Sequence, residues 1–424
     1  MGNLDYTQVL NKIENTRRFG NEPGVVVTAQ VIKVLREKGK QKRIIPYIHV
    51  AGTNGKGSVC AFFSSILKKE HMRVGTFVSP HLVDFEERIT VDGRMIPKED
   101  VTRLGNYLLD IDFGIGLTMF DYCLAMALLY FEEQQCDYMV IETGLGGRLD
   151  STNAIGTPQC AVITKIGYDH MAILGSDIAD IAAEKAGIIK ENGTVVVEQQ
   201  DKRAMQVIEQ EAKKKHARII TVEQSDIARC SGYALRLCGT FQWENAAAAE
   251  LAARYVLGKR YSGPEYEMQY DKTEPKSEKT DLNDRIKSAL EEAVWPGRME
   301  IVSKEPFLLV DGAHNSNGVD ALKESLMQMY PGEKFCFFMG VMADKDYDVM
   351  IREILPLAEE FYTVTPDSDR ALQASHLADF IRKEGVCATE LSGVDEIRKH
   401  LKRDTKNVAF GSLYFIGELK QHHI

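Results

Sequence analysis

The sequence predicts an α/β protein in which two or three domains are built on largely parallel β-sheets. Short apolar runs alternate with longer segments whose apolar residues recur at helical spacing, which is typical of strand–helix–strand units. The chain has 424 residues, enough for domains with sizeable cores. A glycine-rich loop also joins the first strong apolar run to a helical segment, an arrangement typical of phosphate binding.

The first half of the chain contains four predicted strands. Ile44–Val50 is predicted to be a strand that leads into the glycine loop. Further strands are predicted at Tyr138–Ile141, Ala161–Ile166 and Val195–Val197. The helix after the loop carries its apolar residues at helical spacing, namely Val59, Phe62, Phe63, Ile66 and Leu67.

A change in composition separates the two halves. From Ser262 to Asp284 the chain is polar and charged, which predicts a solvated insertion. A second α/β pattern follows, with strands near Phe307–Val310, Phe335–Met339, Phe361–Val364 and Val408–Phe410. The boundary near Trp295–Gly297 therefore predicts one domain over residues 1–295 and a smaller one over residues 296–424.

The composition excludes several classes of protein. With 44% apolar and 27% charged residues, the chain has the balance of a soluble globular protein. Its 52 Lys+Arg against 62 Asp+Glu give a formal charge of −10, which argues against a nucleic-acid partner. The longest apolar stretch, Cys123–Phe131, is too short to cross a membrane, and the N-terminus lacks a secretory pattern.

The eight cysteines occur singly, without a CxxC pair. This spacing predicts neither a zinc thiolate site nor a disulfide framework. We therefore expect a cytoplasmic protein with reduced thiols and no membrane partner.

The loop Gly52–Ser58 reads GTNGKGS and lies between a predicted strand and a predicted helix. Backbone N–H groups in such a loop can bind phosphate oxygens, and Lys56 supplies a mobile cation. The hydroxyl of Ser58 is a candidate Mg²⁺ ligand, although Gly57 stands where the strict Walker A pattern has Ser or Thr.

Polar residues follow two other predicted strands. Glu142 ends one strand, and Asp169 with His170 follows another. Because the carboxyl ends of parallel strands meet at one edge of a sheet, Glu142, His170 and Ser58 predict a site for a hard cation there. In the second half, Arg298 and the turn Asp311–Gly318 could contribute to binding a nucleotide.

Lys185 is the least obvious candidate. The segment from Ser176 or Asp177 to Gly187 predicts a short helix whose apolar stripe, formed by Ile178, Ile181 and Ala182, includes this lysine. Spacing alone favours a lysine that extends its amine to solvent. A confined lysine would instead have a lowered pKa, and its neutral amine could add CO₂ to form a carbamate.

Taken together, the motifs resemble the folylpolyglutamate synthase/dihydrofolate synthase family of the Mur ligase superfamily. The carriers, spread over nearly the whole chain, are IHVAGTNGKGS (Ile48–Ser58), SPHL (Ser79–Leu82), ERI (Glu87–Ile89), ETGLGGRLDSTN (Glu142–Asn153), EKAGIIK (Glu184–Lys190), PGR (Pro296–Arg298), DGAHN (Asp311–Asn315), GVMADKD (Gly340–Asp346) and GSLYFIGE (Gly411–Glu418). Two departures are Ser316, where the family commonly has proline, and the charged insertion.

The resemblance implies a Mur-ligase-like ATPase domain with a phosphate loop, followed by a Rossmann-like α/β domain. It implies an enzyme that uses ATP and two Mg²⁺ ions to add L-glutamate to dihydropteroate or a reduced folate. We expect it to act as a monomer.

The resemblance also assigns roles to individual residues. For ATP it implies Thr53, Asn54, Gly55, Lys56, Gly57, Ser58, Asn245, Arg298 and Asp311. For magnesium it implies Ser58, Ser79, Glu142 and His170. His314 and Lys345 would face the reacting phosphate and the incoming amino acid, while Phe120, Leu149, Asp150 and Ser151 would line the pterin-side pocket. Lys185 aligns with a lysine that is carbamylated in relatives, and so joins Lys56, His170 and His314 as a catalytic candidate.

Three other functions remain to be weighed. A Mur ligase acting on a cell-wall nucleotide precursor would have a nucleotide-binding domain before the loop, and only a short segment precedes it here. A GTPase switch would carry NKxD, and the closest segment, ITKIGYD, lacks it. An ABC-type motor would carry an LSGGQ-like helix start, and none is present. Whether the acceptor is dihydropteroate, a reduced folate or both stays open.

Overall fold

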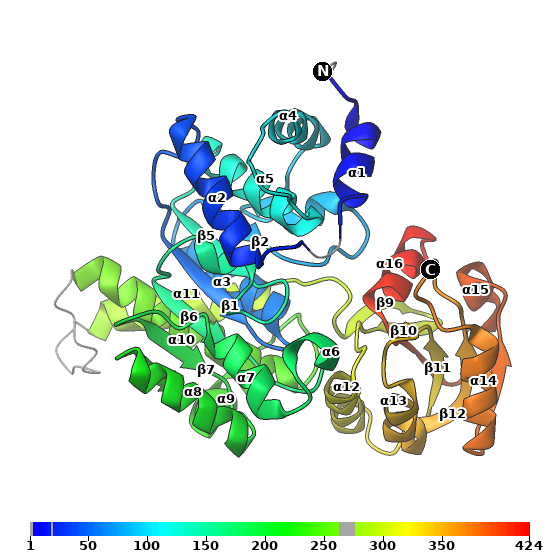
Figure 1. The fold of residues 1–424 in the computed structure, drawn as a ribbon. Helices are drawn as coiled ribbons and strands as arrows, with labels where there is room; N and C mark the ends of the chain where they lie inside the picture. The colour runs from blue at the N-terminus through cyan, green and yellow to red at the C-terminus, as the bar shows by residue number, and fades with distance from the viewer. Residues whose placement is uncertain (1–2, 18–19, 263–275) are drawn as a thin grey trace. The chain divides into compact units, whose positions relative to one another are not determined.

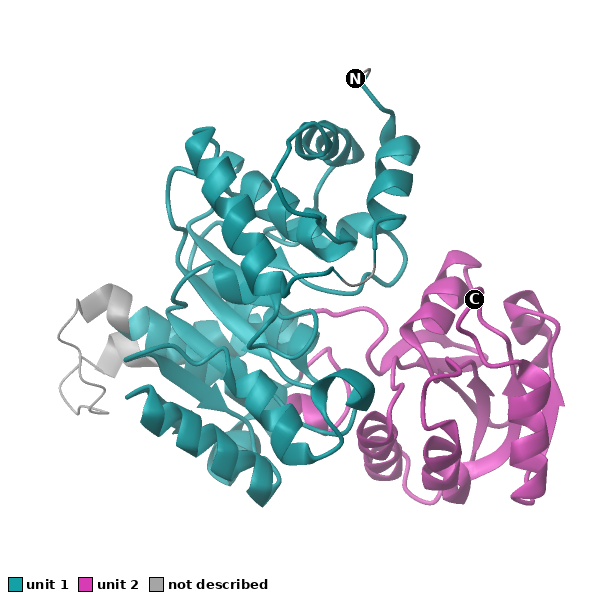
Figure 2. Cartoon of the chain, in the orientation of Figure 1, with its two compact units in different colours: residues 1–234, 244–293 teal, residues 235–243, 294–424 magenta. Residues whose placement is uncertain are grey.

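The computed structural model describes residues 3–17, 20–262 and 276–424, and the chain forms two compact units. Unit 1 comprises Met1–Ala234 and Glu244–Ala293, and unit 2 comprises Leu235–Trp243 and Val294–Ile424 (Figure 2). Each unit contains its own sheet and its own core, so the predicted α/β class with parallel-rich sheets is confirmed.

Unit 1 is built on an eight-stranded sheet in the order β4-β3-β2-β5-β1-β6-β7-β8 (Figure 1). The strands are β1 (Tyr47–Ala51), β2 (Val74–Phe77), β3 (Ile89–Val91), β4 (Arg94–Met95), β5 (Tyr138–Glu142), β6 (Cys160–Ile163), β7 (Thr194–Val197) and β8 (Arg218–Thr221). All neighbours from β2 to β8 pair in parallel, and β3 and β4 form an antiparallel edge. The carboxyl ends of β2, β5, β1, β6 and β7 therefore lie along one edge of this sheet.

The helices of unit 1 bury the apolar faces that the sequence pattern assigns to them. They are α1 (Tyr6–Glu14), α2 (Gly24–Glu37), α3 (Lys56–Lys69), α4 (Lys98–Leu109), α5 (Met119–Glu133), α6 (Met171–Leu174), α7 (Ile178–Ala186), α8 (Lys202–Lys214), α9 (Gln224–Ser231), α10 (Phe241–Ser262) and α11 (Lys276–Glu292). In α3 the five apolar residues expected inside are all fully buried. Two short 3₁₀ helices, η1 (Phe85–Arg88) and η2 (Ser151–Ala154), complete the unit.

The second part of the predicted solvated insertion is helical, which the sequence did not predict, and Asp281, Asn283 and Asp284 in it are exposed. Residues 276–284 lie in helix α11, which packs against α3 and is held there by a hydrogen bond from Ser65 Oγ to the Ala289 carbonyl at 2.6 Å. The buried residues Ile286, Ala289 and Leu290 follow the polar stretch and secure the helix. The remainder, residues 263–275, lies outside the described residues.

Unit 2 contains a six-stranded sheet in the order β13-β12-β11-β14-β10-β9. Its elements are β9 (Glu300–Lys304), β10 (Phe307–Val310), α12 (Ser316–Met329), β11 (Phe335–Met339), α13 (Tyr347–Ile354), η3 (Leu355–Leu357), β12 (Ala358–Thr363), α14 (Ala374–Lys383), β13 (Cys387–Glu390), η4 (Val394–Glu396), α15 (Ile397–His400), β14 (Lys406–Phe410) and α16 (Leu413–Gln421). Only β9 is antiparallel to its neighbour. The four strands expected from the sequence correspond to β10, β11, β12 and β14.

Unit 2 also includes an earlier segment of the chain, residues 235–243. Phe241 and Cys238 pack against the apolar cluster that contains Met299 and the strands of unit 2. Thr240 N donates to Ser325 Oγ at 3.0 Å and fixes the segment to α12. The chain therefore enters unit 2 twice, which a single boundary near residue 295 does not describe.

All eight cysteines are free thiols. Within the described ranges, no helix combines the length and the apolar character that a membrane span requires.

Candidate functional site

The glycine loop lies at the carboxyl end of the central strand β1. Gly55 adopts a left-handed conformation, with φ of 89°, and is the N-cap of α3. A side chain at Gly52 would lie 1.8 Å from Thr164 Oγ1, and one at Gly55 would lie 2.3 Å from Asn245 Oδ1. Glycine is therefore required at both positions by close neighbours as well as by backbone conformation.

The residues after β6 hold this loop in place. The N–H groups of Thr53 and Asn54 donate to the Lys165 carbonyl at 2.9 and 3.2 Å. Thr164 Oγ1 donates to the Asn54 carbonyl at 2.6 Å. Strand β6 ends at Ile163, earlier than predicted, because Thr164 and Lys165 bond to the loop.

The first turn of α3 is suited to an anion. The N–H groups of Lys56, Gly57 and Ser58 occupy the turn whose donors have no carbonyl partner within a helix. Gly55 has no side chain to cap them. Lys56 Nζ folds back over the loop, donating to the carbonyls of Gly52 and Thr53 at 3.2 and 3.3 Å.

Glu142 brings a buried carboxylate to the same edge. It is 4% exposed and ends β5, the strand beside β1. Its Oε1 lies 3.9 Å from Lys56 Nζ, and its Oε2 accepts from the N–H of Ser79, after β2, at 3.2 Å. Three neighbouring strand ends thus bring together Lys56, Glu142 and Ser79.

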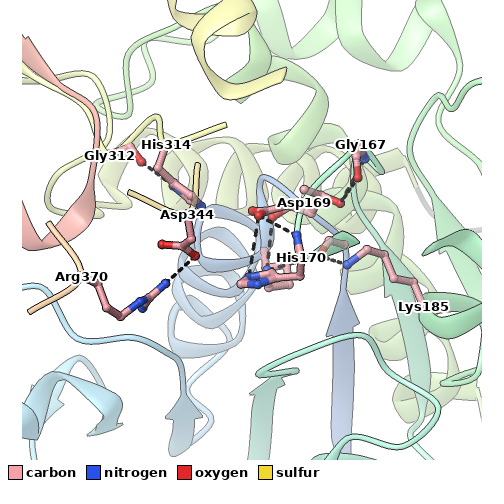
Figure 3. Close-up of polar contacts among 11 residues, drawn as sticks. Gly167, Asp169, His170, Lys185, Gly312, His314, Asp344 and Arg370 are labelled. Carbon is pink, nitrogen blue, oxygen red and sulfur yellow. Dashed lines mark hydrogen bonds and ion pairs between the residues drawn. The ribbon is translucent and has the colours of Figure 1, made fainter. Parts of the chain in front are cut away.

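His170 is positioned differently. It has a left-handed backbone, with φ of 52°, and precedes the single turn of α6. Its imidazole is 40% exposed, and its Nε2 lies 3.9 Å from Asp169 Oδ1 (Figure 3). In the part of the chain that is described, no group of three His, Cys, Asp or Glu side chains is arranged to hold a metal. A role for His170 as a ligand stays a prediction.

Lys185 is buried within unit 1. Helix α7 begins after Asp177, whose side chain accepts from Ala179 N–H at 2.9 Å, and ends before Gly187, as predicted. The interpretation of a lysine reaching solvent is wrong, because Lys185 is 4% exposed and its Nζ donates to the Gly52 carbonyl at 2.7 Å. Burial, and then the charge of Lys56, lower the pKa of Lys185 to about 7.

The segment after Glu142 forms a loop organised by Asp150. Its carboxylate accepts from the N–H groups of Gly144, Leu145 and Thr152 at 3.0, 2.9 and 2.9 Å. Burial raises the pKa of Asp150. Because Thr152 Oγ1 donates to Asp150, it accepts from Nε2 of the buried His49, at 2.7 Å. The structure thus uses Asp150 to shape the loop.

Other candidates for the acceptor side lie around this loop. Ser151 Oγ donates to Asp121 Oδ1 at 2.6 Å, so it too is engaged within the protein. Leu149 is 50% exposed. The Phe120 ring is half-buried and meets the Phe77 ring edge-on, with 5.4 Å between centroids. Leu149 and Phe120 therefore offer apolar surface, while contacts of Asp150 and Ser151 with a substrate stay predictions.

Unit 2 gathers its own candidates at the end of β10. Asp311 is buried, and its two oxygens accept from the N–H groups of Met299 and Ala313 at 2.8 and 2.7 Å. Burial raises its pKa, and the charge of Arg298 opposes the rise. His314 Nδ1 donates to the Gly312 carbonyl at 2.8 Å (Figure 3).

The remaining candidates of unit 2 lie in turns. Asn315 caps α12, and Ser316 is the first residue of that helix, a position where proline is favourable but not required. Lys345 lies between β11 and α13, next to Asp344, which pairs with Arg370 at 2.6 Å (Figure 3).

Comparison with known proteins assigns the chain to a family. It matches the Mur ligase middle domain over residues 50–253 and the Mur ligase glutamate ligase domain over residues 297–411. It is 33% identical to the dihydrofolate synthase/folylpolyglutamate synthase of Bacillus subtilis, with 98% of each chain covered. The chain belongs to the dihydrofolate synthase/folylpolyglutamate synthase family.

Solved structures agree with this assignment. A folylpolyglutamate synthase of Mycobacterium tuberculosis complexed with ADP and AMPPCP superimposes with a TM-score of 0.83 at 25% identity, covering 99% of this chain and 98% of that one. E. coli FolC in complex with DHPP and ADP gives a TM-score of 0.80 at 26% identity, covering 99% and 97%.

Members of this family are ATP-dependent ligases, and the side chains present fit ATP with Mg²⁺. The α3 terminus and Lys56 suit phosphates, and the buried carboxylate of Glu142 with the hydroxyls of Ser58 and Ser79 are oxygen donors of the kind that Mg²⁺ prefers. Histidine is a less usual ligand for so hard an ion.

Sequence reasoning missed residues that support the site. Lys190 Nζ donates to the Asn153 carbonyl at 2.9 Å, and Asn153 Nδ2 donates to the carbonyls of Arg148 and Gly187 at 3.0 and 3.1 Å. These contacts join the loop after Glu142 to the end of α7. Asn153 lies in the motif ETGLGGRLDSTN and Lys190 in EKAGIIK, so the motifs could have indicated that both residues support the site.

Proposed function

We propose that the protein is an ATP-dependent ligase that forms an amide bond between L-glutamate and a folate-type acceptor. The observation that carries the proposal is the convergence of the phosphate loop, Lys56 and the buried Glu142, in a chain that matches synthases of this family along its whole length. An acceptor carboxylate oxygen attacks the γ-phosphorus of ATP, and ADP leaves. The glutamate amine then attacks the acyl phosphate, phosphate leaves, and the amine gives up a proton.

The chain's own residues position and neutralise the phosphates. Thr53–Ser58 would surround them with N–H groups, and Lys56 would neutralise charge that develops as the γ-phosphoryl group moves. Asn245, Arg298 and Asp311 would complete the ATP-binding set. His314 and Lys345 would act near the reacting phosphate and the incoming amino acid.

Ser58, Ser79, Glu142 and His170 would hold magnesium, with two ions as the expected number. When bound, the metal withdraws charge from the phosphate oxygens. What supports the assignment is the position of Glu142 and Ser79 beside Lys56. A structure of a nucleotide complex with Glu142 and His170 on different ions, or on none, would contradict it.

Lys185 would carry a carbamate that supports the second ion. Support comes from its burial and its lowered pKa, since a neutral amine adds CO₂. Labelling with ¹³CO₂ should give a carbamate signal in the wild type and none in Lys185→Ala. That variant should lose most activity, and bicarbonate should not restore it.

Dihydropteroate and reduced folates are the candidate acceptors, and Phe120 and Leu149 the candidate contacts of the pterin ring. We further propose that the protein acts in the cytoplasm as a monomer. These assignments rest on the family and on an acidic composition, with a formal charge of −10.

The test is an ATP-hydrolysis assay with glutamate and with either dihydropteroate or tetrahydrofolate. The proposal expects ADP release to depend on both glutamate and an acceptor. ADP release that ignores both would indicate a nucleotide switch or motor. Dependence on a cell-wall nucleotide precursor instead would indicate a different Mur ligase.

A further inference from the structure

The loop that carries Ser79 ends in a buried arginine that the proposed mechanism leaves unused. Arg88 is 8% exposed and is the last residue of η1, directly before β3. Its carbonyl accepts from the N–H of Val78 at 3.0 Å, so it lies beside the carboxyl end of β2. Arg88 thus belongs to the same sheet edge as the phosphate loop.

The guanidinium of Arg88 has an unusual partner. Its Nε donates to Nδ1 of His81 at 2.8 Å. Because a guanidinium can only donate, this ring nitrogen must present its lone pair. Across residues 3–17, 20–262 and 276–424, no carboxylate lies within ion-pairing distance of Arg88.

Two of the nearby carboxylates, Glu87 and Asp121, are engaged elsewhere. Glu87 accepts from the N–H groups of Leu82, Val83 and Asp84 at 2.7, 2.8 and 2.9 Å. Asp121 accepts from Thr118 and Ser151 at 2.6 Å each. Glu86 is buried, with no hydrogen-bond partner among the described residues for either carboxylate oxygen, and forms no ion pair with Arg88; burial and then Glu86 raise the pKa of Tyr6 in α1.

A buried guanidinium without a counter-ion is unfavourable, because desolvation is not offset by an opposite charge. The terminal nitrogens of Arg88 are therefore suited to an anion supplied by a ligand. A carboxylate matches the fork geometry of a guanidinium and can bind it through two parallel hydrogen bonds.

The sheet order indicates which anion this is. Strands β2 and β5 separate β3 from β1, so at about 4.8 Å per strand the start of β3 lies about 14 Å from the strand that carries the phosphate loop. Burial raises the pKa of Cys123 in α5, and the charge of Arg88 opposes that rise. Arg88 is therefore farther from the phosphate loop than the ends of β2 and β5 are, and we take the acceptor, not ATP, as the source of its anion.

We propose that Arg88 binds the non-reacting carboxylate of the terminal glutamate of a glutamylated folate acceptor. This inference rests on the proposed function and deepens it. Dihydropteroate has one carboxylate, which must react, whereas a glutamylated folate has two. Arg88 therefore determines specificity, favouring acceptors that already carry glutamate.

The test compares Arg88→Gln with the wild type on tetrahydrofolate and dihydropteroate. The ratio of kcat/KM for tetrahydrofolate to that for dihydropteroate should fall roughly 10- to 100-fold, the range for a lost hydrogen-bonded charge pair. Arg94→Gln, an exposed arginine on the neighbouring strand β4, is the matched control and should leave the ratio unchanged.

A modified substrate tests the same contact without a variant. A tetrahydrofolate whose non-reacting carboxylate is a primary amide should lose roughly 10- to 100-fold in kcat/KM with the wild type and much less with Arg88→Gln, because the two changes remove one interaction. If Arg88→Gln does not fold, kcat/KM of Arg88→Lys, together with kcat/KM of the wild type for the amide substrate, still tests the contact.

The outcomes separate failure of the inference about Arg88 from failure of the proposed function. Equal losses on both acceptors, or a wild type that uses the amide as well as the parent, would overturn the inference. A wild type that uses dihydropteroate but not tetrahydrofolate would overturn it while leaving the ligase function intact. A wild type that uses neither acceptor would contradict the proposed function itself.

Discussion

Two lysines share one carbonyl oxygen at the centre of the site. Lys56 and Lys185 donate to the carbonyl of Gly52 at 3.2 and 2.7 Å. Two ammonium groups so close repel each other, and Lys185 is the more buried of the two. Burial, and then the charge of Lys56, lower the pKa of Lys185. Lys56 is therefore the amine that carries the positive charge over the phosphate loop.

Lys56→Ala should therefore impair the chemical step and leave the fold intact. Loss of a preorganised charge at a developing anion typically costs about 10²- to 10³-fold in kcat. Single-turnover kinetics at saturating ATP measure this step. Lys68→Ala, which changes an exposed lysine in the last turn of α3, is the control. Near-normal turnover of Lys56→Ala would remove Lys56 from the mechanism.

Lys185 also makes a prediction about stability and pH. Its pKa is about 7 in the folded protein against 10.5 in an ordinary lysine. Between these values the unfolded chain binds a proton that the folded protein does not, so stability should rise as pH increases from 7 to 10.5. Below about pH 7 both states are protonated, and the lysine's destabilising effect is constant.

The measurement is urea unfolding of the wild type and Lys185→Met in CO₂-free buffer across that range. The difference in unfolding free energy between the two should change in favour of the wild type by at most about 1.4 kcal/mol per pH unit. Parallel curves would show that Lys185 keeps its ordinary pKa.

Residues that directly follow strands could be predicted, and residues that depend on distant contacts could not. Lys56 and Glu142 lie at strand ends, where topology alone brings them to one edge. The burial of Lys185 depends on Gly52, 133 positions away, and spacing within its own helix favoured solvent. For the same reason, the engagement of Asp150 with loop N–H groups was not visible in the sequence.

At the scale of elements, the backbone of the loop after Glu142 packs directly against the end of α7. Arg148 N–H donates to the Glu184 carbonyl at 2.7 Å. Side chains at Gly147 and Gly187 would lie 2.8 Å from the Glu184 carbonyl and 2.2 Å from Arg148 Cβ. The backbones approach so closely that only glycine fits, and this contact sets where Lys185 stands relative to the loop.

Gly187→Ala should consequently destabilise the protein by roughly 1–3 kcal/mol, the usual range for overpacking. It should also lower kcat, because displacing α7 moves Lys185 away from Gly52. Gly116→Ala, where an added Cβ meets nothing within 4 Å, is the matched control. If Gly187→Ala had the same unfolding free energy and the same kcat as Gly116→Ala, the contact between Arg148 and α7 would not position Lys185.

The sequence predicted the strands that consist of apolar residues throughout, and it did not predict the short or polar strands. β10 and β11 begin and end where the apolar runs do. The edge strand β4 has two residues, both exposed, and β13 is mostly exposed, so neither produces an apolar signal. Helix α11 was missed because its first half is polar and charged in sequence, so no apolar periodicity marks it as a helix.

At the scale of the whole molecule, one helix contributes to both units. The chain passes from unit 2 back to unit 1 after Trp243, within α10. Phe241, at the start of this helix, packs in the apolar cluster of unit 2, and Asn245, one turn later, approaches Gly55 of the phosphate loop. Of the residues proposed for ATP, Lys56 belongs to unit 1 and Arg298 to unit 2.

Hydrogen exchange in the presence of a non-hydrolysable ATP analogue and Mg²⁺ should reveal whether both units bind the nucleotide. A ligand at one hundred times its Kd stabilises the state that binds it by about 2.7 kcal/mol, so amides that exchange through unfolding of that unit should slow about 100-fold. We expect slowing in β1 and α3 of unit 1 and in β10 and β14 of unit 2. Arg298→Gln should abolish the effect in unit 2 and largely keep it in unit 1, because the phosphate loop remains. Protection confined to unit 1 in the wild type would remove Arg298 and Asp311 from the ATP-binding set while leaving the phosphate loop assigned.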